Sequence, residues 1–464
     1  MSVGLVSGIL VMNLVVLRAH GNVTLTTLVS FVLSNGAVPA AGLVQGSDGA
    51  FYGTTQGSSG FGTVFKITSS GVFSNLLTFT GVSGSYPGAN PAAGLIWGAD
   101  GNLYGTTQNG GVSNNGTIFK LAANGVFTSL VSFTGTNGAC LGANPVAGLV
   151  RGTNGALYGT TQYGGTNDLI NNYGDGTVFV VTTNGVFASL VSFSGTNGAS
   201  PGANPAAGLV WSTNGFFYGT TESGGTNDLV NNGDGTIFRM SPDGGFASLI
   251  SFNAASGAAP EAGLVQGTDG NLYGTTSGGS LNLGTVFKMT SSGTLTTLLA
   301  FNKTNGANPQ AGLLQGLDGN FYGTTRVGGA NNYGTIFQLT PAGAFATLVS
   351  FGGTNGSLPT AGLVQGTDGN FYGTTASGTT SPQGTAFRFP PPPVLLKWWQ
   401  TNQVVNFVWS AATGQVYQIQ FNTNFNPAGW SNLGGPVNAT NSMAASSDSV
   451  GPGPPRYYRI GLLP

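Results

Sequence analysis

A Tyr-Gly-Thr-Thr element that recurs seven times constrains this 464-residue chain more than any other feature. Successive copies stand 49 to 60 residues apart, and each is preceded by an Ala-Gly-Leu element and followed by a GT[VIA]F element. The tyrosines of the seven copies are Tyr52, Tyr104, Tyr158, Tyr218, Tyr273, Tyr322 and Tyr372. Recurrence at such a period indicates a repeat architecture, in which each unit is one supersecondary structure that stacks on its neighbours.

The first unit, residues 41–79, reads as four short strands. Its apolar run AGLVQG leads into Asp48 and Gly49, and Asp-Gly is a strong hairpin signal because the turn needs positive φ at both central residues. The aromatic and threonine-rich AFYGTT gives a second strand, GTVFKIT a third and VFSNLLTF a fourth. No stretch shows helical periodicity. Four antiparallel strands per unit are typical of a β-propeller blade, so we expect an all-β fold.

The count of fourth strands predicts how the repeats close. Only six copies carry this strand, which ends at Phe79, Phe133, Phe193, Phe252, Phe301 and Phe351. The segment TLTTLVSF (24–31) stands before the first repeat and nearly duplicates TLTTLLAF (294–301). We therefore predict that residues 22–389 form a seven-bladed β-propeller in which the N-terminal strand completes the last blade and leaves no exposed edge. The alternative is an open solenoid, which does not require the strand count to balance.

Residues 22–390 resemble the GloVer tandem repeat family, named for Gloeobacter and Verrucomicrobia. The text that carries the resemblance is GLVQGTDGNFYGTT (362–375) together with the GT[VI]F element that follows such copies. The resemblance implies an exported bacterial protein and implies no activity. The [DN]G-x-[FL]-Y element is also similar to virginiamycin B lyase-like propellers, but those need a catalytic histidine and this chain has only His20.

The C-terminal part predicts a second, smaller β-domain. Four consecutive prolines at 390–393 form a stiff spacer. Beyond them, residues 394–464 contain four strand-like runs, at 404–410, 416–423, 430–437 and 456–463. This pattern favours a small β-sandwich similar to a fibronectin type III module. Such a module could attach the repeats to a surface or serve as a spacer.

The first twenty residues read as a signal peptide. Fifteen mostly apolar residues, 3–17, fit the hydrophobic region of such a peptide and are short for a membrane span. The positive segment that usually precedes this region is missing. A buried N-terminal strand or an uncleaved anchor are the alternatives. We expect a secreted, extracellular or cell-surface protein with no membrane span in its mature form.

Composition excludes several classes of function. Charged residues make up 5% of the chain, with 12 basic and 13 acidic residues scattered singly, so we expect no nucleic-acid partner. The single cysteine, Cys140, rules out an intrachain disulfide. With one cysteine and one histidine, the chain also cannot form a metal site whose ligands are histidines and cysteines. The chain has no second histidine and no GxSxG motif, which argues against nucleophilic catalysis. We expect a monomer.

Acidic and basic residues recur in matched places of the repeat. An Asp often occupies the first hairpin turn, and a Lys or Arg often follows GT[VIA]F, as Asp48 and Lys66 do in the first copy. Because the third strand returns toward the first turn, we expect surface ion pairs such as Asp48–Lys66, each contributing about 0–1 kcal/mol.

Two inserts lengthen the loops between the second and third strands of repeats three and four. They read GGTNDLINNYGDG (164–176) and GGTNDLVNNGDG (224–235) and carry four aspartates, Asp168, Asp175, Asp228 and Asp234. Carboxylate oxygens in a glycine-rich loop suit Ca²⁺, which takes six to eight oxygen ligands. Solvated loops held by Asx-turns are the alternative. Calcium is the one cofactor that the sequence suggests.

One repeat position varies in a way that suggests a ligand. Three residues after the Ala-Gly-Leu glycine, four copies have Gln, whereas repeats two to four have Trp97, Arg151 and Trp211. Tryptophan faces stack on sugars, and arginine binds carboxylates in bidentate fashion. Together with Glu222, these residues form a hypothetical binding site for carbohydrate or another small polar ligand. The alternative is that both tryptophans pack between blades.

Three classes of function remain open at this point. The first is an exported, non-catalytic binding or scaffold protein that recognises an extracellular glycan or surface component. The second is a polysaccharide lyase or glycoside hydrolase, which needs two facing carboxylates; Glu222 with Asp168 or Asp228 is the cluster that the sequence offers. The third is a cell-surface or adhesion component that acts through the C-terminal domain.

Overall fold

The computed structural model describes residues 23–57, 60–166, 174–196, 198–226, 233–279, 281–423, 429–450 and 456–463. Within these ranges every regular element is a strand, and no helix there is long and apolar enough to cross a membrane. The predicted signal segment, residues 1–20, lies outside the described residues. The chain divides into two compact units, of which the first comprises Leu25–Val364 and Tyr372–Arg388 and the second contains the C-terminal strands.

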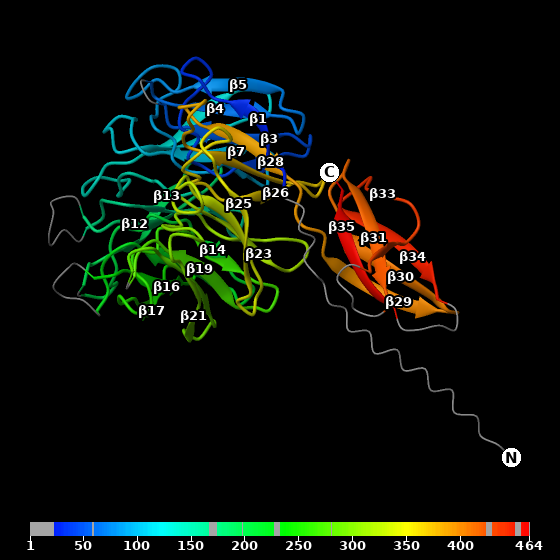
Figure 1. Cartoon of the computed structure of the whole chain (residues 1–464). Coiled ribbons are helices and arrows are strands. Elements are labelled where there is room, and N and C mark those ends of the chain that lie inside the picture. Colours follow the sequence, from blue (N-terminus) through cyan, green and yellow to red (C-terminus); the bar gives the residue numbers. More distant parts are fainter. Residues whose placement is uncertain are drawn as a thin grey trace. The chain divides into compact units, whose positions relative to one another are not determined.

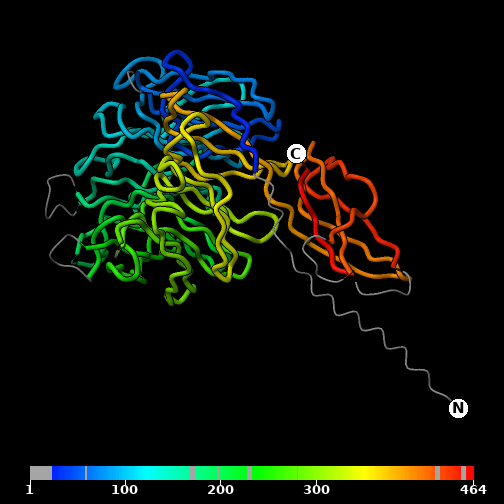
Figure 2. The backbone as a smooth tube through the Cα atoms, viewed as in Figure 1, coloured from blue at the N-terminus to red at the C-terminus, as the bar shows by residue number. Residues whose placement is uncertain are grey.

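Each repeat forms one four-stranded antiparallel sheet, and the part of the chain that the structure describes contains seven such sheets in the repeat region (Figure 1). Figure 2 shows the chain passing from one sheet to the next in sequence order, from blue to yellow. Six sheets consist of four strands consecutive in the sequence, as in the order β2-β3-β4-β5.

The strands of equivalent rank have nearly equal lengths. The first strands are β2 (Val44–Gln45), β6 (Ile96–Trp97), β10 (Val150–Arg151), β14 (Val210–Trp211), β18 (Val265–Gln266), β22 (Leu314–Gln315) and β26 (Val364–Gln365). The second strands are β3 (Phe51–Thr55), β7 (Leu103–Thr107), β11 (Leu157–Thr161), β15 (Phe217–Thr221), β19 (Leu272–Thr276), β23 (Phe321–Thr325) and β27 (Phe371–Thr375). The third strands are β4 (Thr63–Ile67), β8 (Thr117–Leu121), β12 (Thr177–Val181), β16 (Thr236–Met240), β20 (Thr285–Met289), β24 (Thr335–Leu339) and β28 (Thr385–Phe389). The fourth strands are β5 (Phe73–Thr78), β9 (Phe127–Ser132), β13 (Phe187–Ser192), β17 (Phe246–Ser251), β21 (Leu295–Ala300) and β25 (Phe345–Ser350).

The first hairpin of each repeat forms where Asp-Gly or Asn-Gly predicts it. In the first copy Gly49 has a φ of 76°, which a side chain would disfavour, and the Asp48 carboxylate accepts a hydrogen bond from the Ala50 N–H at 3.1 Å. The Tyr52 hydroxyl donates to the other carboxylate oxygen at 2.8 Å. The tyrosine of the repeated element therefore ties the second strand to the turn that precedes it.

The last repeat takes its outer strand from the N-terminus. Strand β1 (Thr26–Ser30) pairs antiparallel with β28, and the sheet order is β1-β28-β27-β26. This is the pairing that the count of fourth strands predicts, and β1 and β28 lie side by side in Figure 1. Phe31, which follows β1, is fully buried and meets the Phe65 ring edge-on at 5.2 Å.

Successive sheets are joined by the first threonine of the repeated element. The hydroxyl of Thr160 donates to the carbonyl of Ala207 in the next repeat at 3.0 Å. The last repeat makes the same contact with the first, because Thr374 donates to the carbonyl of Ala41 at 3.2 Å. The first and last sheets of the repeat region are thus in direct contact.

The apolar core lies between neighbouring sheets. A representative cluster combines Tyr158 and Val178 of repeat three with Leu209 and Phe217 of repeat four, all buried. The Tyr158 and Phe217 rings are 4.2 Å apart. Each sheet packs one face on the preceding sheet and the other face on the following sheet. A repeat therefore cannot bury its apolar residues without both neighbours.

The C-terminal strands form two sheets around one apolar cluster. One sheet has the order β29-β30-β34, and in the other β31 pairs with β32, β33 and β35. Their bounds are β29 (Leu395–Thr401), β30 (Val404–Ser410), β31 (Val416–Asn422), β32 (Ser431–Asn432), β33 (Val437–Asn438), β34 (Met443–Ser449) and β35 (Tyr457–Leu462). Phe407 and Trp409 of the first sheet pack with Tyr417, Ile419 and Tyr458 of the second. The strands predicted at 404–410, 416–423 and 456–463 correspond to β30, β31 and β35. The run predicted as one strand at 430–437 instead contains the short β32 and the start of β33, and β29 and β34 were not predicted.

Candidate functional site

The residues proposed from the sequence as one ligand site lie at two ends of the sheets. Trp211 pairs with Phe217, where β15 begins, whereas Glu222 directly follows Thr221, where β15 ends. Five residues at about 3.3 Å each separate these ends by about 16 Å. Trp97, Arg151 and Trp211 therefore belong to the end that carries the Asp-Gly turns, and the structure does not bring Glu222 to them.

A hollow of about 380 Å³ opens at the turn end, between the first two repeats. We call it the turn-end groove, and the residues that matter for its chemistry are Asp48, Tyr52, Lys66, Trp97 and Leu103. Each of these side chains comes from a strand or turn of the first two repeats. The groove is therefore a product of two neighbouring sheets.

The turn-end groove combines an ion pair with two aromatic rings. Lys66 Nζ lies 2.7 Å from the Asp48 carboxylate, and this contact, with the Tyr52 hydroxyl, holds the pKa of Asp48 below its ordinary value. The predicted Asp48–Lys66 pair is confirmed. The Trp97 indole stands perpendicular to the Tyr52 ring at 5.2 Å. Charged hydrogen-bonding groups thus line the same hollow as an indole.

The variable position on the first strand also bridges neighbouring sheets. The Trp97 indole N–H donates to the carbonyl of Gln45 in the preceding repeat at 3.0 Å. Gln266 and Gln315 make equivalent bridges, since each accepts from a backbone N–H of the preceding repeat, at 3.0 and 2.9 Å. Trp97 therefore keeps the bridging role that glutamine has in other copies and adds an aromatic surface to it.

Trp211 and Arg151 have different surroundings. The Trp211 ring is partly buried and meets the Phe217 ring at 4.6 Å in the apolar layer between repeats three and four. Arg151 is exposed at the end of β10. Neither residue belongs to the turn-end groove between the first two repeats.

A second hollow, of about 420 Å³, lies at the opposite end of the sheets. We call it the mouth cavity, and its polar lining consists of Gln56, Glu261, Gln310, Arg326 and Thr360. These residues come from repeats one, five, six and seven. Each follows either the proline that precedes Ala-Gly-Leu or the Tyr-Gly-Thr-Thr element. The cavity was not predicted from the sequence, although both positions vary between copies while the adjoining Ala-Gly-Leu and Tyr-Gly-Thr-Thr elements do not.

Glu261 lines this cavity, and its negative charge acts on Glu222. Burial raises the pKa of Glu222, the negative charge of Glu261 raises it further, and a hydrogen bond from Gln162 opposes both effects. Glu261 accepts hydrogen bonds from the Ser277 hydroxyl at 2.7 Å and from the Gln310 amide at 2.6 Å. Among the described carboxylates, Glu261 is thus the one whose charge raises the pKa of Glu222.

The repeats match the description of the Gloeobacter/Verrucomicrobia repeat over residues 14–231 and 205–424. The chain belongs to this family. Membership in the Gloeobacter/Verrucomicrobia repeat family agrees with the resemblance that the sequence carries. No curated protein matches the chain.

Three solved structures that match the chain differ widely from it in sequence. A candidate 6-phosphogluconolactonase from Bacteroides uniformis is 16% identical, covers 67% of this chain and 83% of its own, and has a TM-score of 0.44. An ulvan lyase of polysaccharide lyase family 25 is 9% identical, with 84% of each chain covered and a TM-score of 0.35. A xylan β-1,4-xylosidase from Bacillus halodurans is 10% identical, covers 93% of this chain and 100% of its own, and has a TM-score of 0.33. Because these TM-scores are below 0.5, neither fold nor chemistry is inferred from these likenesses.

The predicted calcium ligands of this repeat-family chain are only partly described. Asp168 and Asp228 lie outside the described residues. Asp175 is buried, and the carbonyls of Asp175 and Asp234 accept backbone hydrogen bonds from the following repeats, each at 2.9 Å. No group of three or more His, Cys, Asp or Glu suited to a metal ion occurs within the described ranges. The calcium site stays a prediction.

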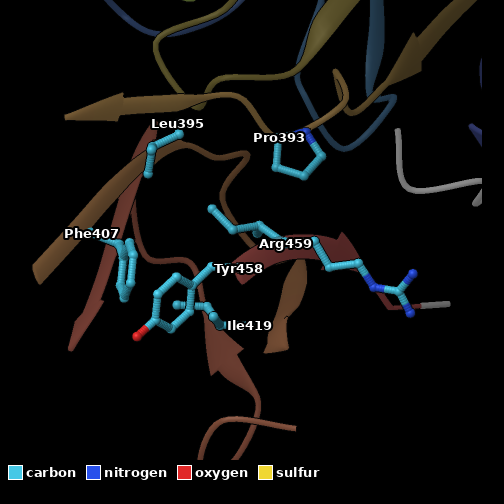
Figure 3. A pocket seen from close by; sticks show the side chains of 7 residues that line it. Pro393, Leu395, Phe407, Ile419, Tyr458 and Arg459 are labelled. Carbon is cyan, nitrogen blue, oxygen red and sulfur yellow. The ribbon is translucent and has the colours of Figure 1, made fainter. Parts of the chain in front are cut away.

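The C-terminal unit contains a small apolar hollow, which Figure 3 shows with Phe407, Ile419 and Tyr458 among its lining residues. Its volume is about 20 Å³, roughly one water molecule. A hollow of this size has no room for an organic ligand.

Proposed function

We propose that this chain is an exported, non-catalytic binding protein whose repeats form a closed seven-bladed β-propeller, and that it binds carbohydrate in the turn-end groove. The apolar N-terminal segment supports export, because it fits the hydrophobic region of a signal peptide. An intact Met1 on protein recovered outside the cell, measured by mass spectrometry, would contradict cleavage of this segment.

Closure of the propeller is supported by contacts that continue from the last repeat to the first. The Thr374 hydroxyl reaches the Ala41 carbonyl just as the Thr160 hydroxyl reaches that of Ala207. The rings of Phe51 and Tyr372, from the first and last repeats, stack 3.9 Å apart. Together with the pairing of β1 and β28, these contacts are those expected when neither end of the sheet series is free.

The observation that carries the binding proposal is the meeting of Trp97 and Tyr52 with the Asp48–Lys66 ion pair in one groove. Sugars present an apolar C–H face that packs on aromatic rings, and hydroxyl groups that bond to charged side chains. The hollow of about 380 Å³ is within the range of ligand pockets, about 300–1,000 Å³. A mono- or disaccharide unit is the ligand of matching size and chemistry.

The test is a glycan-array screen of the full chain, followed by calorimetry with the best glycan. We expect Trp97→Ala to lower affinity at least about tenfold, which corresponds to about 1.4 kcal/mol. Trp398→Ala, at an exposed tryptophan of the C-terminal unit, is the matched control and should change nothing. Because Trp97 also bridges two sheets, Lys66→Gln provides a second variant that leaves that bridge intact. Unchanged affinity in both groove variants would reject the proposal.

The hydrolase alternative is favoured by one observation, the raised pKa of Glu222 beside Glu261. A carboxyl group with a raised pKa next to a second carboxylate is the arrangement that a general acid requires. Release of reducing ends from a polysaccharide, abolished in Glu222→Gln and in Glu261→Gln, would replace the non-catalytic proposal with this one.

A further inference from the structure

Two repeat positions that line the mouth cavity differ in charge between copies. After the proline, the seven copies carry Ala40, Ala92, Val146, Ala206, Glu261, Gln310 and Thr360. After Tyr-Gly-Thr-Thr, they carry Gln56, Gln108, Gln162, Glu222, Ser277, Arg326 and Ala376. Strand pairing and packing do not require charge at these positions, because other copies are small or neutral there. Three charged residues are placed at these positions in a chain that is only 5% charged.

One side of the cavity is acidic and held in place. Both oxygens of Glu261 accept hydrogen bonds, from Ser277 and from Gln310. Glu222 is near enough for its ionisation to be opposed by the charge of Glu261. A bound cation would relieve this repulsion, which is the electrostatic condition for an ammonium-binding site.

The same cavity carries a positive charge. The Arg326 guanidinium is exposed and lines the cavity, and within the residues that the structure describes no ion pair joins it to Glu261. Thr360 also lines the cavity, next to the last repeat's Ala-Gly-Leu element.

We propose that the mouth cavity binds a small zwitterion, an amino acid or short peptide whose ammonium group meets Glu261 and whose carboxylate meets Arg326. Arginine binds a carboxylate through two parallel N–H bonds, which gives orientation as well as affinity. The Glu261 carboxylate and the amide side chains of Gln56 and Gln310 supply the acceptors that an ammonium group needs. The volume of about 420 Å³ accommodates a ligand of dipeptide size.

This site is separate from the turn-end groove and goes beyond the carbohydrate binding proposed above. The two hollows share no lining residue and lie at opposite ends of the sheets. A ligand in one does not displace a ligand in the other, and each proposal can fail without the other.

The test is calorimetry of the full chain with a series of unbranched amino acids from glycine to 6-aminohexanoate, and with glycylglycine. The series varies the separation of the two charges while keeping the chemistry the same. Butylamine and butyrate, each with one of the charges, are the comparison probes. We expect one member of the series to bind at least about tenfold more tightly than either probe, because it alone satisfies both charges.

Variants of each charged residue complete the test. Glu261→Gln and Arg326→Gln should each weaken binding of the best zwitterion about tenfold or more. Arg151→Gln, the same exchange at an exposed arginine on the other end of the sheets, is the matched control and should leave binding unchanged. Arg326 is exposed, so its variant keeps the test valid even where Glu261→Gln alters folding. No binding by any member, equal binding by the single-charge probes, or full binding by Arg326→Gln would overturn the proposal.

Discussion

Gly42 and Gly362 belong to the first and last repeats, yet a β-carbon built on Gly42 would lie 3.4 Å from the carbonyl oxygen of Gly362. The same glycine of each other repeat faces its predecessor in the same way, and these distances lie between 3.0 and 3.5 Å. The segments that contain this glycine and lead into the first strand of each repeat, here called the inner strands, therefore follow one another with backbone in contact with backbone. The absence of a side chain at this position is what permits the close approach.

The tightest of these contacts gives the first prediction. A β-carbon on Gly208 would lie 3.0 Å from the carbonyl oxygen of Gly148, whereas one on Gly60 meets nothing within 4 Å. Gly208→Ala should destabilise the chain by about 1–3 kcal/mol, because the inner strands must move apart. Gly60→Ala is the control and should leave the midpoint of denaturant unfolding unchanged. Equal stability of the two variants would show that the inner strands are loosely packed.

The N-terminal strand gives the second prediction. Phe31 is fully buried, as is Phe133, which ends the fourth strand of the second repeat. Phe31→Ala and Phe133→Ala should each cost about 3–5 kcal/mol in chemical denaturation. Were the chain an open solenoid, its first strand would tolerate the change, and Phe31→Ala would cost far less than Phe133→Ala.

Much of the fold could be predicted from the sequence because each strand is specified locally. Asp-Gly and Asn-Gly turns, together with strand runs such as FYGTT, determine where the strands begin and end. The missing fourth strand of the last repeat pointed to residues 24–31, which are distant in the sequence. Of the two C-terminal strands that were missed, β29 is almost wholly exposed, and β34 alternates between exposed and buried positions but has only Ala444 and Asp448 at the buried ones, so neither shows the apolar alternation of a half-buried strand.

The partners of the turn aspartates were predicted less well. The sequence suggested lysine and arginine, but of those pairs only Asp48–Lys66 is an ion pair within the described part of the repeats. The regular partner is the tyrosine hydroxyl, as in Tyr104 with Asp100 at 2.7 Å and Tyr322 with Asp318 at 2.6 Å. A tyrosine in a strand pattern indicates a core residue, and the pattern does not predict that its hydroxyl bonds to the turn aspartate.

The mouth cavity could not be predicted, because it depends on residues far apart in the chain. Gln56, Glu261, Gln310 and Arg326 meet only when repeats one, five and six surround one hollow. A comparison of repeat positions identifies which of them vary, but not which variable positions face one another.

The tyrosine hydroxyl gives the third prediction. Tyr273 donates to the Asp269 carboxylate at 2.8 Å, whereas the Tyr158 hydroxyl accepts from the neutral Asn154 amide at 3.0 Å and donates to the Pro242 carbonyl at a longer 3.4 Å. Hydrogen bonds to charged groups contribute about 1.5–3 kcal/mol and neutral ones about 0.5–1.5 kcal/mol. Tyr273→Phe should therefore lower the free energy of unfolding more than Tyr158→Phe. The reverse order would show that the hydroxyl bonds do not stabilise the turns.

The pH dependence of stability gives the fourth prediction. The pKa of Glu222 in the folded chain is raised above its ordinary value of 4.5, first by burial and then by Glu261. The folded state thus binds the proton more tightly than the unfolded state, so stability falls as the pH rises from 4.5 through the folded pKa. Glu222→Gln removes this loss, and its melting temperature should exceed that of the natural chain at pH 7 but not at pH 4. A difference that is the same at both pH values would contradict the raised pKa.

Ring closure is tested most directly by a cross-link between β1 and β28, and the mouth cavity depends on closure because repeat one meets repeats five to seven there. Thr26 and Arg388 are paired across these strands, and paired residues have Cα atoms about 4.5–5.5 Å apart, within the range that a disulfide spans. In a Cys140→Ser background, Thr26→Cys with Arg388→Cys should oxidise to a disulfide that mass spectrometry detects. The control pairs Thr26→Cys with Gln338→Cys, which occupies the equivalent position in the neighbouring sheet.

Closure by the N-terminal strand predicts a disulfide in the first variant and none in the control, and a gain of about 2–4 kcal/mol in the free energy of unfolding, since the bond closes a long loop. Failure of Thr26→Cys and Arg388→Cys to form the bond, or equal bond formation in the control, would contradict closure by the N-terminal strand.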